Sequence, residues 1–279
     1  MNSINADLHC HSVISDGTLT PEALALRAQK NGVQLWALTD HDELGGQIRA
    51  QNAARDIGLS YLCGVEVSVS LMGQTIHIVG LGVDPQNQIL IDGLRRTRDG
   101  RSLRGMSMAE QLTQAGIEGA YEGALKFASN PELLSRTHFA RFLVEQGICK
   151  STDEVFRKYL VEGKPGYVDH VWATLQNAID WILQAGGAAV IAHPGRYRLT
   201  DLQMQELFRL FKELGGQGIE IVTGSHSPAQ YAEYAKIAQK YDFLGSRGSD
   251  FHDPKESRTD LGQLPPLPAE ITPVWTLFQ

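Results

Sequence analysis

The order of hydrophobic and polar residues predicts short buried strands that alternate with amphipathic helices. Near the N-terminus, TPEALALRAQKNG predicts a helix with Thr20 as N-cap, Pro21 at the first position and Asn31-Gly32 at the end. VQLWALT over 33–39 predicts the buried strand that follows. Further helices are expected over 45–58, 175–187, 201–216 and 228–241, and further strands over 61–70, 74–83, 188–195, 218–222 and 243–252. This alternation indicates parallel strands joined by crossover helices.

The middle of the chain interrupts that alternation. From about residue 95 to 165, helical patterns follow one another without an intervening strand. We therefore expect an α/β body made of residues 1–95 and 166–279, interrupted by a helical insertion of residues 96–165. Five or more strand–helix units favour a barrel or a doubly wound sheet. Within the body, a hairpin across Met72-Gly73 is expected to join two of the strands.

The composition limits the kinds of ligand and the cellular compartment that are expected. The chain is 42% hydrophobic and carries a formal net charge of −7, so any phosphate binding must be local rather than a property of the whole surface. Three scattered cysteines, Cys10, Cys63 and Cys149, argue against a disulfide framework and favour a reducing compartment. The sequence shows no signal-peptide pattern and no apolar run of the ~20 residues that span a bilayer. A cytoplasmic enzyme or binding protein without a membrane partner is expected.

Histidines and acidic residues recur where the expected strands end. They are His9, His11, Asp16, His41, Glu66, His77, His193, Asp250 and His252. Loops at the strand ends of a parallel barrel meet on one face, so these side chains are expected to converge. A single such histidine is more often a core residue, but five separate motifs share this placement. Six imidazoles and three carboxylates exceed the ligands that one ion needs, which indicates two or three ions with shared carboxylates.

The motifs around these residues resemble a known family. DLHCHSVISDGTLTP, ALTDHDELGG, GVEVS, HIVGLG, IAHPGR and GSDFH resemble the signature motifs of the PHP (polymerase and histidinol phosphatase) superfamily. The resemblance covers both flanks of the expected insertion. It implies a distorted (β/α)7 barrel with a trinuclear metal centre, and it places the helical insertion over the mouth of the active site.

The resemblance also implies how the ligands are shared. The first ion would be held by His9, His11, Glu66 and Asp250, the second by Glu66, His77 and His193, and the third by Asp16, His41 and His252, with Glu66 as the bridge. Manganese is the expected metal, with iron and zinc as alternatives, because imidazole and carboxylate suit all three. The attacking group would be a metal-bridging hydroxide, with no single protein nucleophile.

A second set of residues is expected to select the substrate. Five arginines lie within residues 95–104 of an acidic chain, and guanidinium groups can bind phosphate oxygens in a bidentate manner. An arginine-rich helix face is usually only solvated. We nevertheless expect Arg101, Arg104 and Arg136 to bind a phosphate that the metals do not cleave, assisted by Ser135. NPELLSRTHFARFLVEQG and VFRKYLVEGKPGYV in the insertion resemble the bacterial 3',5'-nucleoside bisphosphate phosphatases and the related 5'-to-3' exoribonuclease AM.

The sequence also allows predictions for other polar and aromatic residues near the motifs. Asp7 and Asp40 are expected to hydrogen-bond ligand imidazoles, although Asp40 could instead cap a helix. Glu220 is expected either beside the ligands or as a polar core residue. Trp172 is expected in the core. His138 could contact a phosphate or a base.

These expectations leave several functions open. The leading one is removal of the 3'-phosphate from nucleoside 3',5'-bisphosphates, which gives nucleoside 5'-phosphates. The same site could act as a 5'-to-3' exoribonuclease on short 5'-phosphorylated RNA. A histidinol-phosphate type of phosphatase would leave the arginines without a second phosphate, and a non-catalytic metal scaffold would be expected to have lost ligands. The expected partners are a small nucleotide or short RNA, and no protein partner is implied.

Overall fold

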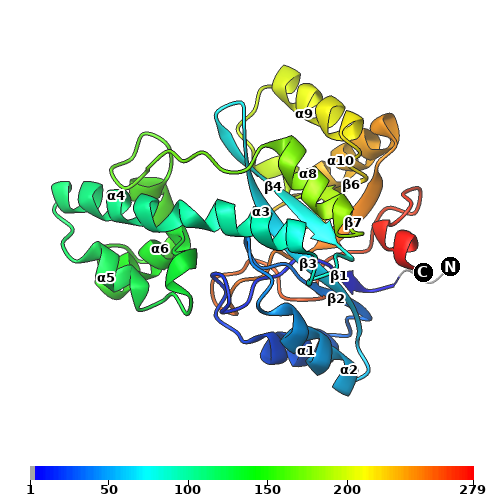
Figure 1. Cartoon of the computed structure of the whole chain (residues 1–279), viewed down its shortest axis with the longest axis horizontal. Helices are drawn as coiled ribbons and strands as arrows, with labels where there is room; N and C mark the ends of the chain where they lie inside the picture. The colour runs from blue at the N-terminus through cyan, green and yellow to red at the C-terminus, as the bar shows by residue number, and fades with distance from the viewer. Residues whose placement is uncertain (1–3) are drawn as a thin grey trace.

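The computed structural model describes residues 4–279, and its body is a seven-stranded sheet closed into a barrel (Figure 1). The strands, which neighbour one another in sequence order, are β1 (Ala6–Asp7), β2 (Leu35–Leu38), β3 (Ser60–Leu71), β4 (Gln74–Leu81), β5 (Ala188–Ile191), β6 (Gly218–Thr223) and β7 (Leu244–Gly248). The barrel closes where the amide of Leu8 donates to the carbonyl of Arg247 at 3.0 Å and Cys10 pairs with Phe251. The expected distorted (β/α)7 barrel is confirmed. Residues 1–3 of the expected barrel segment lie outside the described residues.

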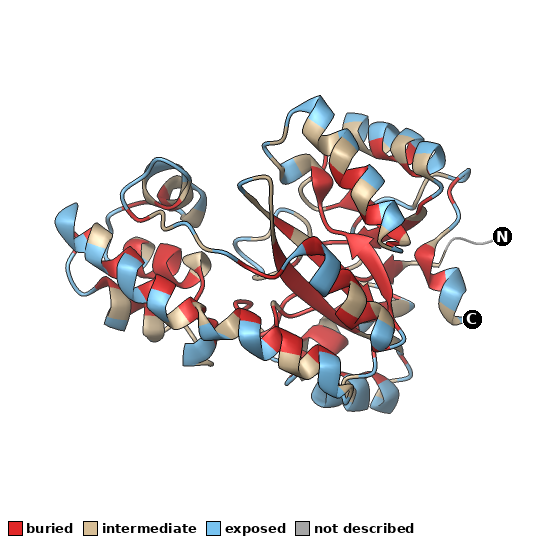
Figure 2. Cartoon of the chain, turned by 45° about the horizontal axis from the view of Figure 1, so that its top comes forward, coloured by how far each residue is buried: buried red, intermediate tan, exposed pale blue. Residues whose placement is uncertain are grey.

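Five helices surround the barrel, and their starts follow from local capping. They are α1 (Pro21–Lys30), α2 (Gln47–Asp56), α8 (Leu175–Gln184), α9 (Asp201–Glu213) and α10 (Pro228–Tyr241). Thr20, Thr174, Thr200 and Ser227 cap four of them by accepting an N–H of the first turn. Figure 2 shows the strands almost wholly buried and the helices exposed on their outer faces, so the barrel wall forms the main core.

The barrel is distorted because β4 runs antiparallel to both β3 and β5. Met72 and Gly73 form the hairpin between β3 and β4, with φ of +51° and +74°. Positive φ at both central residues gives the turn twist that suits a two-residue hairpin. The reversal puts the start of β4 at the barrel mouth. His77 therefore reaches the site from the first half of β4 and Glu66 from within β3, whereas the other ligands lie in the loops that follow the parallel strands.

The insertion has a hydrophobic core of its own. Its helices are α3 (Gln88–Asp99), α4 (Arg101–Gln114), α5 (Ala120–Leu125), α6 (Arg136–Glu145) and α7 (Thr152–Val155), followed by a π-helical turn at Phe156–Leu160. Leu90 and Leu94 of α3 pack into the barrel core, whereas Met108 and Leu112 of α4 belong to the second core. Helices α3 and α4 thus form the rod that joins the two bodies in Figure 1. The division at 96–165 stays a prediction.

Membrane insertion has no support among the described helices. Over residues 4–279, none combines the length and the apolar character that crossing a bilayer requires.

Candidate metal centre

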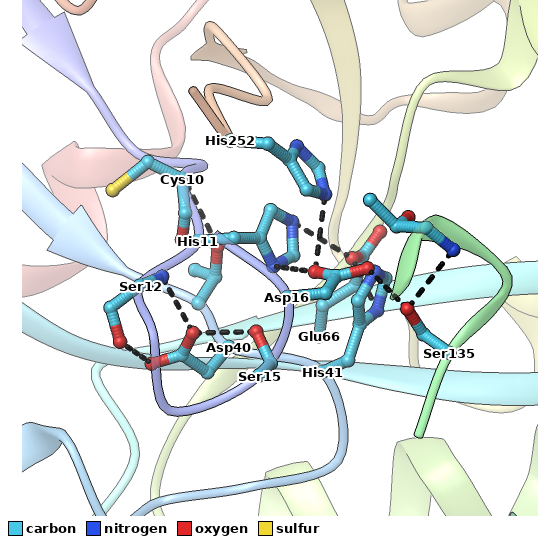
Figure 3. A network of polar contacts seen from close by, with 12 residues as sticks. Cys10, His11, Ser12, Ser15, Asp16, Asp40, His41, Glu66, Ser135 and His252 are labelled. Atoms are coloured by element: carbon cyan, nitrogen blue, oxygen red, sulfur yellow. Dashed lines mark hydrogen bonds and ion pairs between the residues drawn. The ribbon is translucent and has the colours of Figure 1, made fainter. Parts of the chain in front are cut away.

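The structure brings together all nine residues expected as ligands. In four overlapping groups, their ligand-type atoms lie within 4.8 Å of one another. The groups are His11, Asp16, His41 and His252; His9, Glu66 and His193; His9, His11 and Asp250; and His41, Glu66 and His77. Figure 3 shows His11, Asp16, His41, Glu66 and His252 turned toward one another across the barrel mouth. The convergence explains why ligand-type residues recur at the strand ends.

Glu66 lies at the centre of the cluster and is fully buried. Its Oε1 lies 2.9 Å from His77 Nδ1 and 3.0 Å from His193 Nε2. Its Oε2 lies 2.9 Å from His41 Nδ1 and 3.3 Å from His11 Nε2. The two oxygens of one carboxylate therefore face different sets of imidazoles, which is the arrangement that a bridging ligand requires.

The unsatisfied polar atoms of the cluster fit bound cations. Buried atoms without a hydrogen-bond partner are His11 Nδ1, Asp16 Oδ1, His41 Nδ1, Glu66 Oε2, His77 Nδ1 and His193 Nδ1. The Nε2 atoms of His9 and His11 lie only 3.2 Å apart. Burying such atoms unpaired is costly, and divalent ions would satisfy carboxylate oxygens and imidazole lone pairs together. His41 belongs to two of the ligand groups, so its assignment to the third ion alone stays a prediction.

In the metal-free cluster, burial and neighbouring carboxylates shift the pKa values of the histidines in two opposite directions. Burial lowers the pKa of His41 and of His193 to about 4, so both rings are neutral at neutral pH and ready to bind an ion. Burial also disfavours the charged form of His11, but Asp250 and Glu66 outweigh it and raise its pKa to about 10. Glu220, Glu66 and Asp250 likewise outweigh burial at His9 and raise its pKa.

Metal binding should therefore release protons. His11 is protonated below about pH 10 in the metal-free protein, and an ion needs its lone pair, so the apparent affinity for Mn²⁺ should rise from pH 6 to pH 9. Calorimetric titration in buffers of different ionisation enthalpy measures the release. We expect metal binding to release at least about one proton per protein at pH 7. An affinity independent of pH over this range would contradict the charge assignment.

Asp7 and Asp40 do not play the expected role. Within the described residues neither bonds an imidazole, because nearby loop donors occupy their oxygens. Asp40 accepts from the Ser12 amide at 2.7 Å and the Ser15 hydroxyl at 2.6 Å (Figure 3). Asp7 accepts from the amides of Ser249 and Gly262, each at 2.8 Å. The two carboxylates instead shape the loops that carry Asp16 and Asp250.

Glu220 is the carboxylate that orients a ligand ring. Its Oε1 lies 2.7 Å from His9 Nδ1, which leaves Nε2 of that ring toward the cluster, and its Oε2 accepts from the His193 amide at 2.6 Å. The loop after β5 is held further by His226, whose Nε2 accepts from the Gly195 amide at 3.0 Å. Because His193 has φ of +26°, this strained loop needs such support.

The expected substrate arginines differ in how their charges are balanced. Arg101 forms a buried ion pair with Asp42 and lies over the Trp172 ring at 4.6 Å. Arg104 and Arg136 make only backbone-carbonyl and aromatic contacts, and neither has a carboxylate partner within the described chain. Burial lowers the pKa of both, and for Arg104 the neighbouring Arg136 and Arg101 add to the effect. Because these two guanidinium groups have no anionic partner, this part of the cavity favours the binding of an anion.

These arginines share a cavity of about 110 Å³ with the metal cluster. Ser135 lies there as N-cap of α6, and its hydroxyl donates to Asp16 Oδ2 at 3.1 Å. Sequence reasoning did not assign the remaining lining residues to the site, and these include Arg196 and Trp172. Arg196 follows His193 in the IAHPGR motif and pairs with Asp250 at 2.6 Å, so its position in the motif was an available signal. His138 is buried, and its Nδ1 accepts from the Ser135 amide at 3.1 Å, so it supports the α6 cap.

Comparison with known sequences agrees with the geometry. The family model described as PHP domain matches residues 7–246. The 3',5'-nucleoside bisphosphate phosphatase of Chromobacterium violaceum is 49% identical over 271 residues, covering 97% of this chain and 95% of the relative. The 5'-3' exoribonuclease Rnm of Escherichia coli is 40% identical over 275 residues, covering 98% of this chain and 93% of the relative.

Solved structures share the whole architecture. An amidohydrolase from Chromobacterium violaceum, with bound sulfate and no metal, superposes with a TM-score of 0.95 at 48% identity and covers 98% of this chain and 95% of its own. A Bifidobacterium adolescentis protein provisionally described as a metal-dependent phosphoesterase superposes with a TM-score of 0.81 at 28% identity, covering 98% and 94%. The barrel and the insertion therefore occur together in relatives of similar length.

Proposed function

This chain belongs to the PHP family, and from that premise we propose that it removes the 3'-phosphate from nucleoside 3',5'-bisphosphates and leaves nucleoside 5'-phosphates. One observation carries the choice of substrate. Arg104 and Arg136 are two cations without an acidic partner, and they share the cavity with the metal ligands. A substrate with a second phosphate would supply the missing anion. The relative named as a bisphosphate phosphatase supports the same choice.

Different residues would act on the two phosphates of the substrate. The nine ligands would hold up to three divalent ions, with manganese proposed and iron or zinc as alternatives. Such ions activate water and neutralise phosphate charge when bound. Arg104 and Arg136 would bind the 5'-phosphate, and Ser135 would assist by keeping Asp16 in position through its hydroxyl donor. Arg196 pairs with Asp250 and presents its remaining donors to the cavity.

The exoribonuclease alternative has its own support. A relative that is 40% identical is named for this activity, and the cavity continues past the metal ligands into a second one of about 250 Å³. In RNA, a phosphodiester replaces the 3'-phosphate, so both substrates could use one set of residues. A monophosphate such as histidinol phosphate would leave Arg104 and Arg136 without an anion. A non-catalytic scaffold is disfavoured because all nine ligand positions are filled.

Substrate profiling tests the proposal. Manganese-loaded protein should hydrolyse adenosine 3',5'-bisphosphate with a kcat/KM at least about tenfold above that for histidinol phosphate, since one charge-assisted contact corresponds to about that factor. The product should be adenosine 5'-phosphate, resolved by chromatography. Release of the 5'-phosphate instead would show that the two phosphate positions are exchanged. Equal rates on both substrates would contradict the role of the arginines.

A further inference from the structure

Arg141 of α6 joins the insertion to two barrel loops that carry metal ligands, and its side chain is buried. Its Nη1 donates to the backbone carbonyl of Asp16 at 2.7 Å. Its Nη2 and Nε donate to the carboxylate of Glu256 at 3.0 and 3.3 Å. Asp16 is itself one of the nine ligands, and Glu256 lies in the loop that follows the ligand His252. One guanidinium group therefore fixes both loops relative to α6.

The same two loops are bonded to each other. The amide of Thr18 donates to the carbonyl of His252 at 2.9 Å, and the Thr18 hydroxyl donates to the carboxylate of Asp253 at 2.6 Å. The amide of His252 is held in turn by the hydroxyl of Ser257 at 2.8 Å. The two loops and the side chain of Arg141 thus form a closed set of contacts, so a shift of α6 would be transmitted to both loops.

The insertion reaches one group of ligands and not the others. Within residues 4–279, Asp16 is the only one of the nine ligands that a hydrogen bond joins to the insertion, through Arg141 and through the Ser135 hydroxyl (Figure 3). Asp16 belongs to the group that also contains His11, His41 and His252, called the Asp16 group below. The ligands His9 and His193 are held instead by Glu220 of the barrel. Contact with the insertion therefore distinguishes the Asp16 group from the rest of the cluster.

We propose that Arg141 is a positioning residue for the ion of the Asp16 group, and that it couples this ion to the contact between the insertion and the barrel. The inference rests on the proposed metal centre. Arg141 touches neither ion nor substrate and acts through Asp16 and through the loop of His252. Because coupling between two binding events is reciprocal, the ion should also hold the insertion in place. The insertion carries Arg104 and Arg136, so this ion and the arginines proposed for the second phosphate would be brought into position together.

Metal analysis of variants tests the positioning role. At a fixed concentration of free Mn²⁺, Arg141→Gln should bind one ion fewer than wild type, because losing a residue that supports ligands weakens metal binding by about 10- to 100-fold. The affinities of the other ions should stay within about twofold of wild type. Arg141→Lys keeps the charge and should recover part of the loss, and Glu256→Gln, which leaves the Asp16 contact intact, should lose less. Arg49→Gln breaks a two-bond ion pair with Glu22 and is the matched control, with no ion affected.

Hydrogen exchange of α6 separates positioning from folding. In wild type, saturating Mn²⁺ should slow exchange of the α6 amides, and in Arg141→Gln this effect of the metal should shrink by about tenfold. A purely structural role would speed exchange by the same factor with and without Mn²⁺, so the effect of the metal would be unchanged.

The outcomes separate this inference from the metal centre on which it rests. If wild type binds its ions and Arg141→Gln binds the same number, or weakens every ion equally, the inference is wrong and the metal centre stands. An unchanged effect of Mn²⁺ on α6 exchange would overturn it as well. If wild type itself binds fewer than two ions, the metal centre fails and the inference fails with it. Should Arg141→Gln not fold, Glu256→Gln decides the question, and metal binding equal to wild type in that variant would overturn the inference.

Discussion

Replacing Glu66 with glutamine is expected to lower hydrolysis of adenosine 3',5'-bisphosphate by more than about a hundredfold and to remove bound metal at the same time. Changing a residue that merely supports a metal ligand costs about 10–100-fold in affinity or activity, and Glu66 contacts both halves of the cluster directly. The amide is neutral, so it would also remove the negative charge that Glu66 would supply to ions held by the cluster. Elemental analysis alongside initial rates measures both effects, with two to three ions per chain expected in wild type.

The control is a ligand at the edge of the cluster. His77→Asn removes an imidazole that faces only Oε1 of Glu66, so we expect a smaller loss of metal and of rate. Circular dichroism of both variants separates metal loss from unfolding. Loss of a single ion in Glu66→Gln, with the others retained and near-normal rates, would contradict a bridging role. One ion or none in fully active wild type would contradict the trinuclear centre itself.

The convergence of the nine expected ligands could be predicted from the sequence because each lies on a strand or in the loop that follows one. His9 and His11 follow β1, and alternation along an extended chain puts both rings on one side. The hairpin at Met72-Gly73 was predictable from its turn residues, and the reversal of β4 that it causes brings His77 to the mouth. Periodicity and turn chemistry are local properties. Predictions based on them therefore need no knowledge of tertiary contacts.

Residues that support the ligands were harder to predict because their partners are remote or are backbone groups. Glu220 bonds His9 across 211 positions of sequence, a contact that only barrel closure creates. Asp7 and Asp40 neighbour ligand residues in sequence, yet their oxygens are taken by loop amides and hydroxyls. Trp172 is buried, as expected of a core residue, but its ring also lies beside Arg101 at the cavity wall, which the sequence did not indicate. Sequence proximity to a ligand is therefore a weak guide to which side chain orients it.

The arginines expected to bind the second phosphate show the same limit, because their partners could not be predicted from the sequence. Arg101, Arg104 and Arg136 are equivalent by residue type, but Asp42 neutralises Arg101 across 59 positions of sequence. Removing Arg101 would leave the buried carboxylate of Asp42 without its counter-charge, so the substitution would mix destabilisation with any effect on substrate. Arg136 has no such partner within the described chain and is the cleaner probe.

Arg136→Ala should weaken selection for the 5'-phosphate without removing metal. We expect kcat/KM for adenosine 3',5'-bisphosphate to fall by about ten- to a hundredfold, because a hydrogen bond to a charged group contributes about 1.5–3 kcal/mol. Hydrolysis of adenosine 3'-monophosphate should change little, since that substrate never had the second phosphate. Arg136→Lys should recover part of the loss, because lysine restores the charge but not the bidentate geometry. The measurement compares both substrates in wild type and in both variants at constant salt.

The comparison of substrates decides what Arg136 does. Its guanidinium lines both the first cavity and the second one beyond the metal ligands, so contact with the reacting phosphate is the competing assignment. A contact with the reacting phosphate would slow both substrates by the same factor. If Arg136 contacts the 5'-phosphate, Arg136→Ala slows only the bisphosphate. Adenosine 3'-monophosphate has no 5'-phosphate, so it makes no contact with Arg136 that the substitution could remove. Equal slowing with intact metal content would therefore move Arg136 from substrate selection to the reacting centre and leave Arg104 as the remaining unpaired cation for the 5'-phosphate.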